Sequence, residues 1–197
     1  MFIQIIQGKC TRQDECREGV ARWQRDLAPG AIGWLGGTYG FTDDDQFMGI
    51  VRFESRESAA ANSNRPEQGA WWAEMEALFD GPVEFHDAED VTLMLNGGSD
   101  DAGFVQVIRG KVDDAAALKA MVTDTGQLHE MRPDIIGGTL AIEADGTFTE
   151  TVAFSDEESA RKGEQMSMPD DVRQAMESAM HDVTFADLHH PWFASKG

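Results

Sequence analysis

Apolar residues form two strand-like runs that read almost alike. Phe2-Ile3-Gln4-Ile5-Ile6-Gln7-Gly8-Lys9 reappears 102 positions later as Phe104-Val105-Gln106-Val107-Ile108-Arg109-Gly110-Lys111. Both runs are rich in β-branched and apolar residues, which is typical of β-strands. Because nearly every position of the first run is apolar, we expect both of its faces to be buried.

Three further landmarks recur in the same order at almost the same spacing. Gly36-Gly37-Thr38 matches Gly137-Gly138-Thr139, and residues 53–59 match 154–160, both at an offset of 101. Val83-Glu84-Phe85 matches Val183-Thr184-Phe185 at an offset of 100. A repeated order with nearly constant spacing indicates that the chain contains two copies of one unit.

Each copy predicts the order strand, helix, hairpin, helix, strand. Thr11 or Asp14, and in the second copy Asp113, can cap helices that run to about Leu27 and Glu130. The other predicted elements are hairpins at 32–40 with 46–54 and 135–144 with 147–154, helical regions from Ser55 and Ser155 interrupted near Pro66 and Pro169, and closing strands at 83–87 and 183–188. This βαββαβ order is that of the ferredoxin-like fold.

The sequence therefore predicts an α+β protein with two tandem ferredoxin-like units, 1–95 and 103–197, joined by a Gly/Asp-rich linker at 96–102. Residues 91–95 have no visible copy near the end of the chain. We interpret them as an extra strand, with pairing to the other half as one option. Helices cover only one face of such a sheet. We therefore expect the two units to pack sheet against sheet, as an intramolecular dimeric α+β barrel.

The charge of the chain excludes several kinds of partner. Its 197 residues include 36 acids and 16 bases, a net charge of −20. Such a surface repels nucleic acids, and no basic cluster is present that would bind anionic lipid. No apolar run predicts a membrane span or an export signal, so we expect a cytoplasmic protein. The excess of Asp over Lys fits either a salt-adapted proteome or a GC-rich genome, and both interpretations stay open.

These features together resemble a known group of proteins. A first strand like Phe2–Lys9, a hairpin, Asn64-Arg65-Pro66-Glu67 leading into Trp71-Trp72, and a closing strand are similar to the antibiotic-biosynthesis-monooxygenase-like dimeric α+β barrels. The resemblance implies a barrel made of two units, here a monomeric pseudo-dimer that can associate further. Members include cofactor-free oxygenases of aromatic polyketides, haem-degrading enzymes and proteins without an assigned activity.

The haem-degrading pattern is incomplete in both copies. The resemblance implies an Asn near the first strand, with a Trp and a His on the second helical region. The first copy has Trp71 and Trp72 but no His in that region, and the second has His181 but no Trp. The first strands carry Gln4 and Gln106 in place of Asn. We therefore expect neither haem degradation nor a cofactor.

Two functional hypotheses follow. In the first, the protein is a cofactor-independent monooxygenase acting on a small apolar or aromatic molecule. Gln4, Tyr39, Arg52, Trp72 and Gln106 would then bind the substrate, and His86 and His181 would be the catalytic acid–base groups. In the second, the protein is a non-catalytic, small-ligand-binding or stress-related barrel. The Trp71-Trp72 pair occurs in one copy only, which favours a single specialised pocket.

Each candidate residue also has a structural interpretation. Gln4 and Gln106 either face a ligand or bond to nearby backbone. Trp71 and Trp72 point about 100° apart on a helix, so one can pack in the core while the other lines a pocket. His86 and its neighbour Asp87 should face opposite sides of a strand. The remaining histidines lack metal-ligand spacing, and Cys10 and Cys16 should be reduced thiols.

Overall fold

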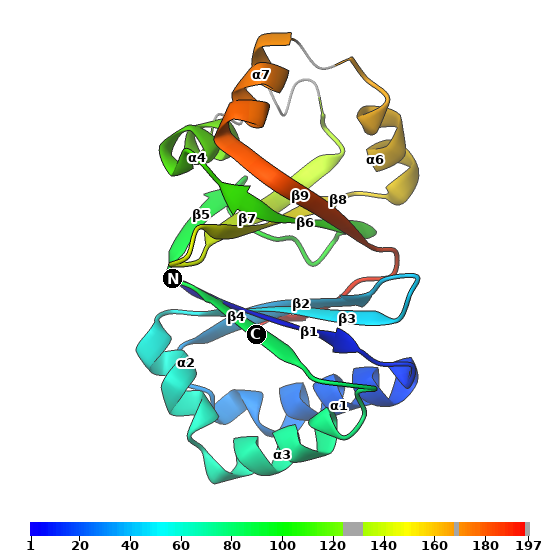
Figure 1. Ribbon diagram of the computed structural model, residues 1–197. Coiled ribbons are helices and arrows are strands. Elements are labelled where there is room, and N and C mark those ends of the chain that lie inside the picture. Colours follow the sequence, from blue (N-terminus) through cyan, green and yellow to red (C-terminus); the bar gives the residue numbers. More distant parts are fainter. Residues whose placement is uncertain (124–131, 168–169, 196–197) are drawn as a thin grey trace. The chain divides into compact units, whose positions relative to one another are not determined.

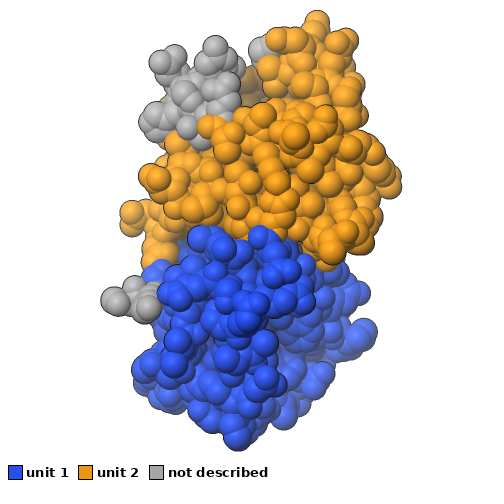
Figure 2. All heavy atoms as spheres, turned by 90° about the vertical axis from the view of Figure 1, so that its left-hand side faces the viewer, with its two compact units in different colours: residues 1–89, 192–197 blue, residues 90–191 orange. Residues whose placement is uncertain are grey.

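The computed structural model describes residues 1–123, 132–167 and 170–195. The chain divides into two compact units (Figure 2). Unit 1 comprises Met1–Glu89 and Trp192–Gly197, and unit 2 comprises Asp90–Pro191. No helix among the described residues is long and apolar enough to cross a membrane.

Unit 1 is an antiparallel sheet with helices on one side (Figure 1). The strand order is β10-β2-β3-β1-β4. Its strands are β1 (Phe2–Lys9), β2 (Trp34–Phe41), β3 (Gln46–Phe53), β4 (Glu84–Ala88) and β10 (Trp192–Ser195), and its helices are α1 (Gln13–Asp26), the short 3-10 helix Ala28–Gly30, α2 (Arg56–Ser63) and α3 (Pro66–Glu76).

Unit 2 repeats this plan with the strand order β5-β7-β8-β6-β9. Its strands are β5 (Asp90–Met94), β6 (Phe104–Val112), β7 (Ile135–Ile142), β8 (Thr147–Phe154) and β9 (Met180–Leu188), and its helices are α4 (Ala115–Thr123), α6 (Glu157–Glu164) and α7 (Asp170–Ala179). The predicted extension of the first helix to Glu130 lies outside the described residues. The α+β class and the ferredoxin-like units are confirmed.

Each sheet is completed by an edge strand from outside its own repeat. Strand β5 pairs with β7 and places Met94 opposite Gly138, whereas β10 pairs with β2 and places Ala194 opposite Gly37. Since the two glycines belong to the repeated Gly-Gly-Thr sites, β10 is the counterpart of β5. The interpretation of residues 91–95 as an extra strand that pairs with the other half is confirmed. Its structural counterpart Trp192–Ser195 gives no visible sequence match, because it is short, follows a proline and shares no residue pattern with β5. The predicted boundary at 96–102 therefore differs from the boundaries of the compact units, because β5 belongs to unit 2 and β10 belongs to unit 1.

Helix starts follow local capping, with some changes from the sequence expectation. Ser55 and Ser58 form a capping box at the start of α2. The equivalent cap of α6 is Asp156, not Ser155, and the cap of α4 is Asp114, not Asp113. Neither Thr11 nor Asp14 caps α1, because its N-cap is Arg12 and Thr11 instead bonds to the Asp80 carboxylate.

Strand β1, which lies between β3 and β4, is buried on both faces, as predicted. Phe2 and Ile6 point toward the helices and pack with Val20 and Trp23 of α1. The alternate residues Ile3 and Ile5 lie on the other face and are 0% exposed. This alternation assigns every residue of the sheet either to the helix-facing side or to the opposite side. Packing of the two units as a barrel stays a prediction.

We predict that strand β10 stabilises unit 1 mainly through Trp192. Its ring stacks on Tyr39 and Phe41 at centroid distances of 5.8 and 5.7 Å, and the Arg17 guanidinium lies 4.3 Å above it. Trp192→Ala should lower the free energy of unfolding by about 2–3 kcal/mol in urea denaturation, since the ring is only half-buried. Phe185→Ala, at a side chain that is 64% exposed, is the control and should change it by less than about 0.5 kcal/mol. Equal effects of the two variants would contradict the assignment.

Candidate functional site

A pocket of about 60 Å³ lies in unit 1 between the helix-facing side of the sheet and the helices. The sheet supplies its floor, and α1, the end of α2 and α3 supply its walls. The lining residues are Gln4, Ile6, Val20, Trp23, Tyr39, Phe47, Val51, Phe53, Asn62, Ser63, Gln68, Trp71, Trp72 and Met75. Most of them are apolar or aromatic, as is typical of small-molecule sites.

Three tryptophans form the wall opposite the sheet. The ring centroids of Trp23 and Trp71 are 6.2 Å apart, and those of Trp71 and Trp72 are 5.9 Å apart. Trp71 donates its indole N–H to the carbonyl of Gly19 at 2.9 Å, and Trp23 donates its own to Gln68 Oε1 at 2.6 Å. Because these polar atoms have partners, the indoles are held in place with their apolar faces available.

Gln4 lies on the floor of the pocket and bonds to a carboxylate. Its Nε2 donates to Asp87 Oδ1 at 2.9 Å across the β1–β4 pair. The partner is therefore a side chain on the neighbouring strand rather than backbone. The carboxylate orients the amide, so that a second N–H and the carbonyl oxygen of Gln4 remain for other contacts.

Tyr39 brings a phenol into the same pocket. Its ring stacks between Phe47 and Trp192, with centroid distances of 6.3 and 5.8 Å. The hydroxyl lies over Gly37, where any Cβ would come within 2.4 Å of it, so the glycine is needed for this placement. Burial raises the pKa of Tyr39 well above its usual range, so the phenol stays protonated at neutral pH. Among the described residues its hydroxyl has no hydrogen-bond partner, which leaves a donor available to a ligand.

The structure brings together three of the predicted site residues, Gln4, Tyr39 and Trp72. Arg52 lies on the opposite face of the same sheet, where its Nη1 is 3.4 Å from Thr38 Oγ1. His86 also lies on that face, because it pairs with Ile5 while Asp87 pairs with Gln4. The alternation expected for His86 and Asp87 is confirmed, and it separates both Arg52 and His86 from the pocket.

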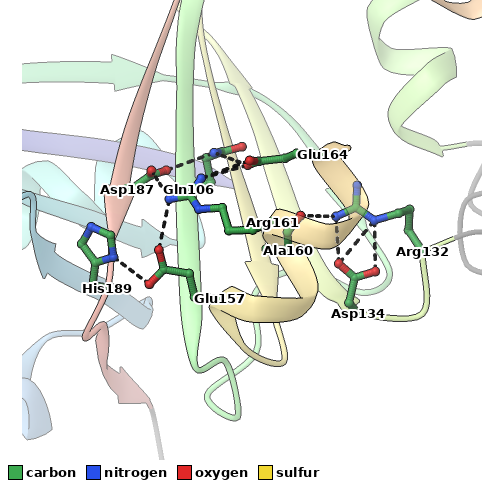
Figure 3. A network of polar contacts seen from close by, with 9 residues as sticks. All are labelled: Gln106, Arg132, Asp134, Glu157, Ala160, Arg161, Glu164, Asp187 and His189. Carbon is green, nitrogen blue, oxygen red and sulfur yellow. Dashed lines mark hydrogen bonds and ion pairs between the residues drawn. The ribbon is translucent and has the colours of Figure 1, made fainter. Parts of the chain in front are cut away.

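The other two predicted residues belong to unit 2. Gln106 donates to Glu164 Oε1 at 3.1 Å and to Asp187 Oδ1 at 3.0 Å (Figure 3). His181 lies at the start of β9, half-exposed, with its Nδ1 2.8 Å from Asp113 Oδ2. Neither residue lines the unit 1 pocket.

The cysteines are free thiols with a packing role. Both are 0% exposed, and Cys10 Sγ lies 3.4 Å from the carbonyl oxygen of Leu78. Burial raises the pKa of both thiols, which opposes formation of a nucleophilic thiolate. Among the described residues no group of three His, Cys, Asp or Glu side chains converges as a metal site would require.

The polar part of the pocket wall was not anticipated from the sequence. Asn62 and Ser63 at the end of α2 and Gln68 on α3 line the pocket. Asn62 accepts a hydrogen bond from Arg65 Nη1 at 2.9 Å. Nothing in the local pattern distinguishes these residues from other polar helix residues, because their role depends on how α2 and α3 pack on the sheet.

Unit 2 carries a different ionisable group on the helix-facing side of its sheet. Glu150 of β8 lies between Ile108 and Leu140, both of which belong to the apolar core. It corresponds to Gly49 of unit 1, whereas Leu140 corresponds to Tyr39. No described side chain pairs with the carboxyl group. Burial raises the pKa of Glu150 to about 7.

No protein-family model and no curated protein matches the sequence. A candidate monooxygenase from Fusobacterium nucleatum is structurally similar, with a TM-score of 0.79 at 10% identity, covering 100% of this chain and 94% of that one. An anthrone oxidase-like protein gives a TM-score of 0.70 at 8% identity, with coverages of 99% and 94%.

A ferredoxin-fold protein from Listeria monocytogenes that is related to antibiotic biosynthesis monooxygenases gives a TM-score of 0.55 at 10% identity, covering 96% of this chain and 94% of that one. At such identities the likeness concerns the fold. The chain has an antibiotic-biosynthesis-monooxygenase-like fold, as the sequence resemblance implied.

We predict that Glu150 makes stability fall with rising pH. The unfolded chain releases this proton near pH 4.3, whereas the folded protein holds it until about pH 7. The folded state therefore binds more protons between these values, and its stability decreases across that window as pH rises. Glu150→Gln should raise the free energy of unfolding by up to about 3 kcal/mol above pH 7 and leave it unchanged below pH 4.5. Urea denaturation at pH 4 and pH 8 measures both values.

The exposed Glu76→Gln is the matched control and should show no such pH-dependent difference. A gain for Glu150→Gln that is equal at both pH values would indicate improved packing instead of a buried charge.

Proposed function

We propose that the unit 1 pocket binds a small aromatic molecule with a polar oxygen, and that the protein is a cofactor-independent monooxygenase acting on it. The observation that carries the proposal is the Tyr39 hydroxyl, protonated and without a described partner, on the floor of a pocket walled by tryptophans. A hydrogen-bond donor in an apolar pocket favours a ligand that offers an acceptor at that point.

The shape of the pocket favours a planar ligand. Trp71 and Trp72 line the pocket on the helix side, and Tyr39 and Gln4 line it on the sheet side, so aromatic rings favour a flat aromatic ligand there. A volume of about 60 Å³ is smaller than the cavity of about 150 Å³ that holds benzene. We therefore infer that only the edge of one ring enters and that the rest of the molecule extends out past the partly exposed side chains of Gln4 and Trp72.

The proposed reaction oxidises an activated aromatic methylene, the class suggested by the anthrone oxidase-like neighbour. The CH2 group and O2 give a carbonyl group and water, so the substrate carbon supplies all four electrons and no cofactor is consumed. Loss of a proton from the methylene first gives an enolate. Hydrogen bonds from Tyr39 and Gln4 to the enolate oxygen would stabilise that charge.

Asp87 is the proposed proton acceptor. It is the carboxylate bonded to a lining residue, through Gln4 Nε2 at 2.9 Å, and it lies on the same helix-facing side of the sheet. His86 and His181, the acid–base groups expected from the sequence, lie away from the pocket. Asp87→Asn should therefore slow oxygen consumption more than His86→Gln or His181→Gln does.

We predict that Tyr39→Phe lowers the rate of oxygen consumption with anthrone by about 100-fold, the cost of removing one donor to a developing oxyanion. The ring between Phe47 and Trp192 is retained, so folding should not change. An oxygen electrode measures the rate, and urea denaturation checks stability. Thr38→Val deletes the neighbouring hydroxyl, which points to the opposite face, and should keep the wild-type rate. No oxygen consumption by the wild-type protein over a panel of anthrones and phenols would defeat the oxygenase proposal.

A non-catalytic binding protein is the second candidate. It is favoured by one observation, that the lining residues include neither a carboxylate nor an imidazole. Native mass spectrometry of the purified protein distinguishes the two candidates when combined with the oxygen measurements. A retained aromatic molecule that is recovered unchanged in air would support sequestration without catalysis.

A further inference from the structure

The two units differ at the same place on their second helical region. Helices α2 and α6 correspond at an offset of 101, which aligns the caps Ser55 and Asp156. Ala60 then corresponds to Arg161, and Ser63 to Glu164. Ala60 and Ser63 lie about one helical turn apart on α2, and Arg161 and Glu164 do so on α6. Each of these two pairs therefore occupies a single face of its helix.

The strand residues beneath these positions are alike in the two units. Gln4 pairs with Asp87 across β1 and β4, and Gln106 pairs with Asp187 across β6 and β9. The amide donates to the carboxylate in both, at 2.9 and 3.0 Å. The difference between the units at this point therefore comes from the helices.

In unit 1 the end of α2 borders the pocket without a side-chain bridge to the strands. Ser63 lines the pocket and is exposed, and Gln4 is partly exposed beneath it. Ala60 has no polar group with which to bridge the gap. Among the described residues, no side chain of α2 bonds to Gln4 or Asp87.

In unit 2 the helix is tied to the strands by charged groups (Figure 3). Arg161 bonds to Asp187, and its Nη1 donates to Glu164 Oε1 at 3.0 Å. Glu164 Oε1 also accepts from Gln106 Nε2 at 3.1 Å. The Arg161 guanidinium lies 5.0 Å from the centre of the Phe104 ring, so its stem covers the apolar floor. A network of this kind is more stabilising than an isolated surface ion pair.

The outer contact between helix and strand is present in both units. Arg56 and Glu89 form an ion pair at 3.3 Å in unit 1. The corresponding residues of unit 2, Glu157 and His189, are 2.8 Å apart with the acidic and basic partners exchanged. Since this contact is kept, the units differ at Ala60 and Ser63, next to the pocket, and not along the whole helix.

We propose that Ala60 and Ser63 determine access to the unit 1 pocket, and that the Arg161–Glu164 network closes the corresponding position between helix and strands in unit 2. The protein would then take up one aromatic molecule per chain, through unit 1. This proposal rests on the proposed ligand-binding function of unit 1. An apolar ligand entering unit 2 would have to separate Arg161 from three carboxylates, those of Glu157, Glu164 and Asp187.

The test introduces the charged residues of the unit 2 network at the corresponding positions of unit 1. In Ala60→Arg/Ser63→Glu, the new arginine can pair with Asp87 and the new glutamate with Gln4, as in unit 2. Three of the five tryptophans, Trp23, Trp71 and Trp72, line the pocket, and none belongs to unit 2. A change in acrylamide quenching of tryptophan fluorescence relative to the wild type therefore reports access to the pocket without any ligand. We expect weaker quenching and, if the closed form dominates tenfold, an affinity for anthrone that is about tenfold lower.

The matched control is Ala61→Arg/Asn64→Glu, which places the same charges at exposed positions one residue further along the helix. It should behave as wild type in both measurements. Ala60→Arg alone tests the closure if the double variant does not fold. Unchanged quenching in a folded entrance variant, or an equal decrease in the control, would overturn the proposal. Reduced quenching without anthrone binding by the wild type would support the entrance and reject the proposed function.

Discussion

The pairing of β1 with β3 and β4 is the constraint on which the rest of unit 1 depends. Side chains alternate along a strand, so a given register decides which residues can meet. The observed register places Gln4, Val51 and Asp87 on one face and Ile3, Arg52 and Ala88 on the other. A slip of one residue in β1 would turn the side chain of Gln4 away from the helices. The tryptophans on α1 and α3 would then face the residues that now lie on the opposite side of the strand. The strand register therefore decides which side chains line the pocket, and each side chain contributes only once the register is set.

Much of the fold could be predicted because the same element order can be predicted independently from each copy of the repeat. Two copies of one strand–helix–hairpin pattern support each other, and the units have the predicted element order. The site was less predictable, because the pairing between distant strands decides which residues line the pocket. Gln4 and Tyr39 were recognisable as polar groups within apolar strands. Only the cross-strand register shows that Arg52 and His86 lie outside the pocket. Strand β10 was not predicted, because four residues after a proline are too few to form a recognisable pattern.

The two units show how a duplicated core can diverge without loss of the fold. Gly49 leaves room for Tyr39, whose ring would be 3.2 Å from a Cβ at that position. Unit 2 has the leucine and the glutamate, Leu140 and Glu150, at the corresponding pair of positions. One unit thus presents a neutral phenol to an aromatic pocket, and the other carries a carboxyl group whose proton is retained to about pH 7. Such exchanges alter polarity inside the core while the backbone pairing stays the same.

The overall charge gives the neutral donors of unit 1 their significance. A net charge of −20 makes the approach of an anionic ligand unfavourable and raises the cost of forming an anion within the protein. An aromatic substrate would therefore enter in its neutral form and become ionised only inside the pocket. There the surrounding field opposes the new charge, so stabilisation must come from groups in direct contact with it. Tyr39 and Gln4 can provide it because hydrogen bonds in an apolar pocket act at short range and in low dielectric, where they exceed their strength in water.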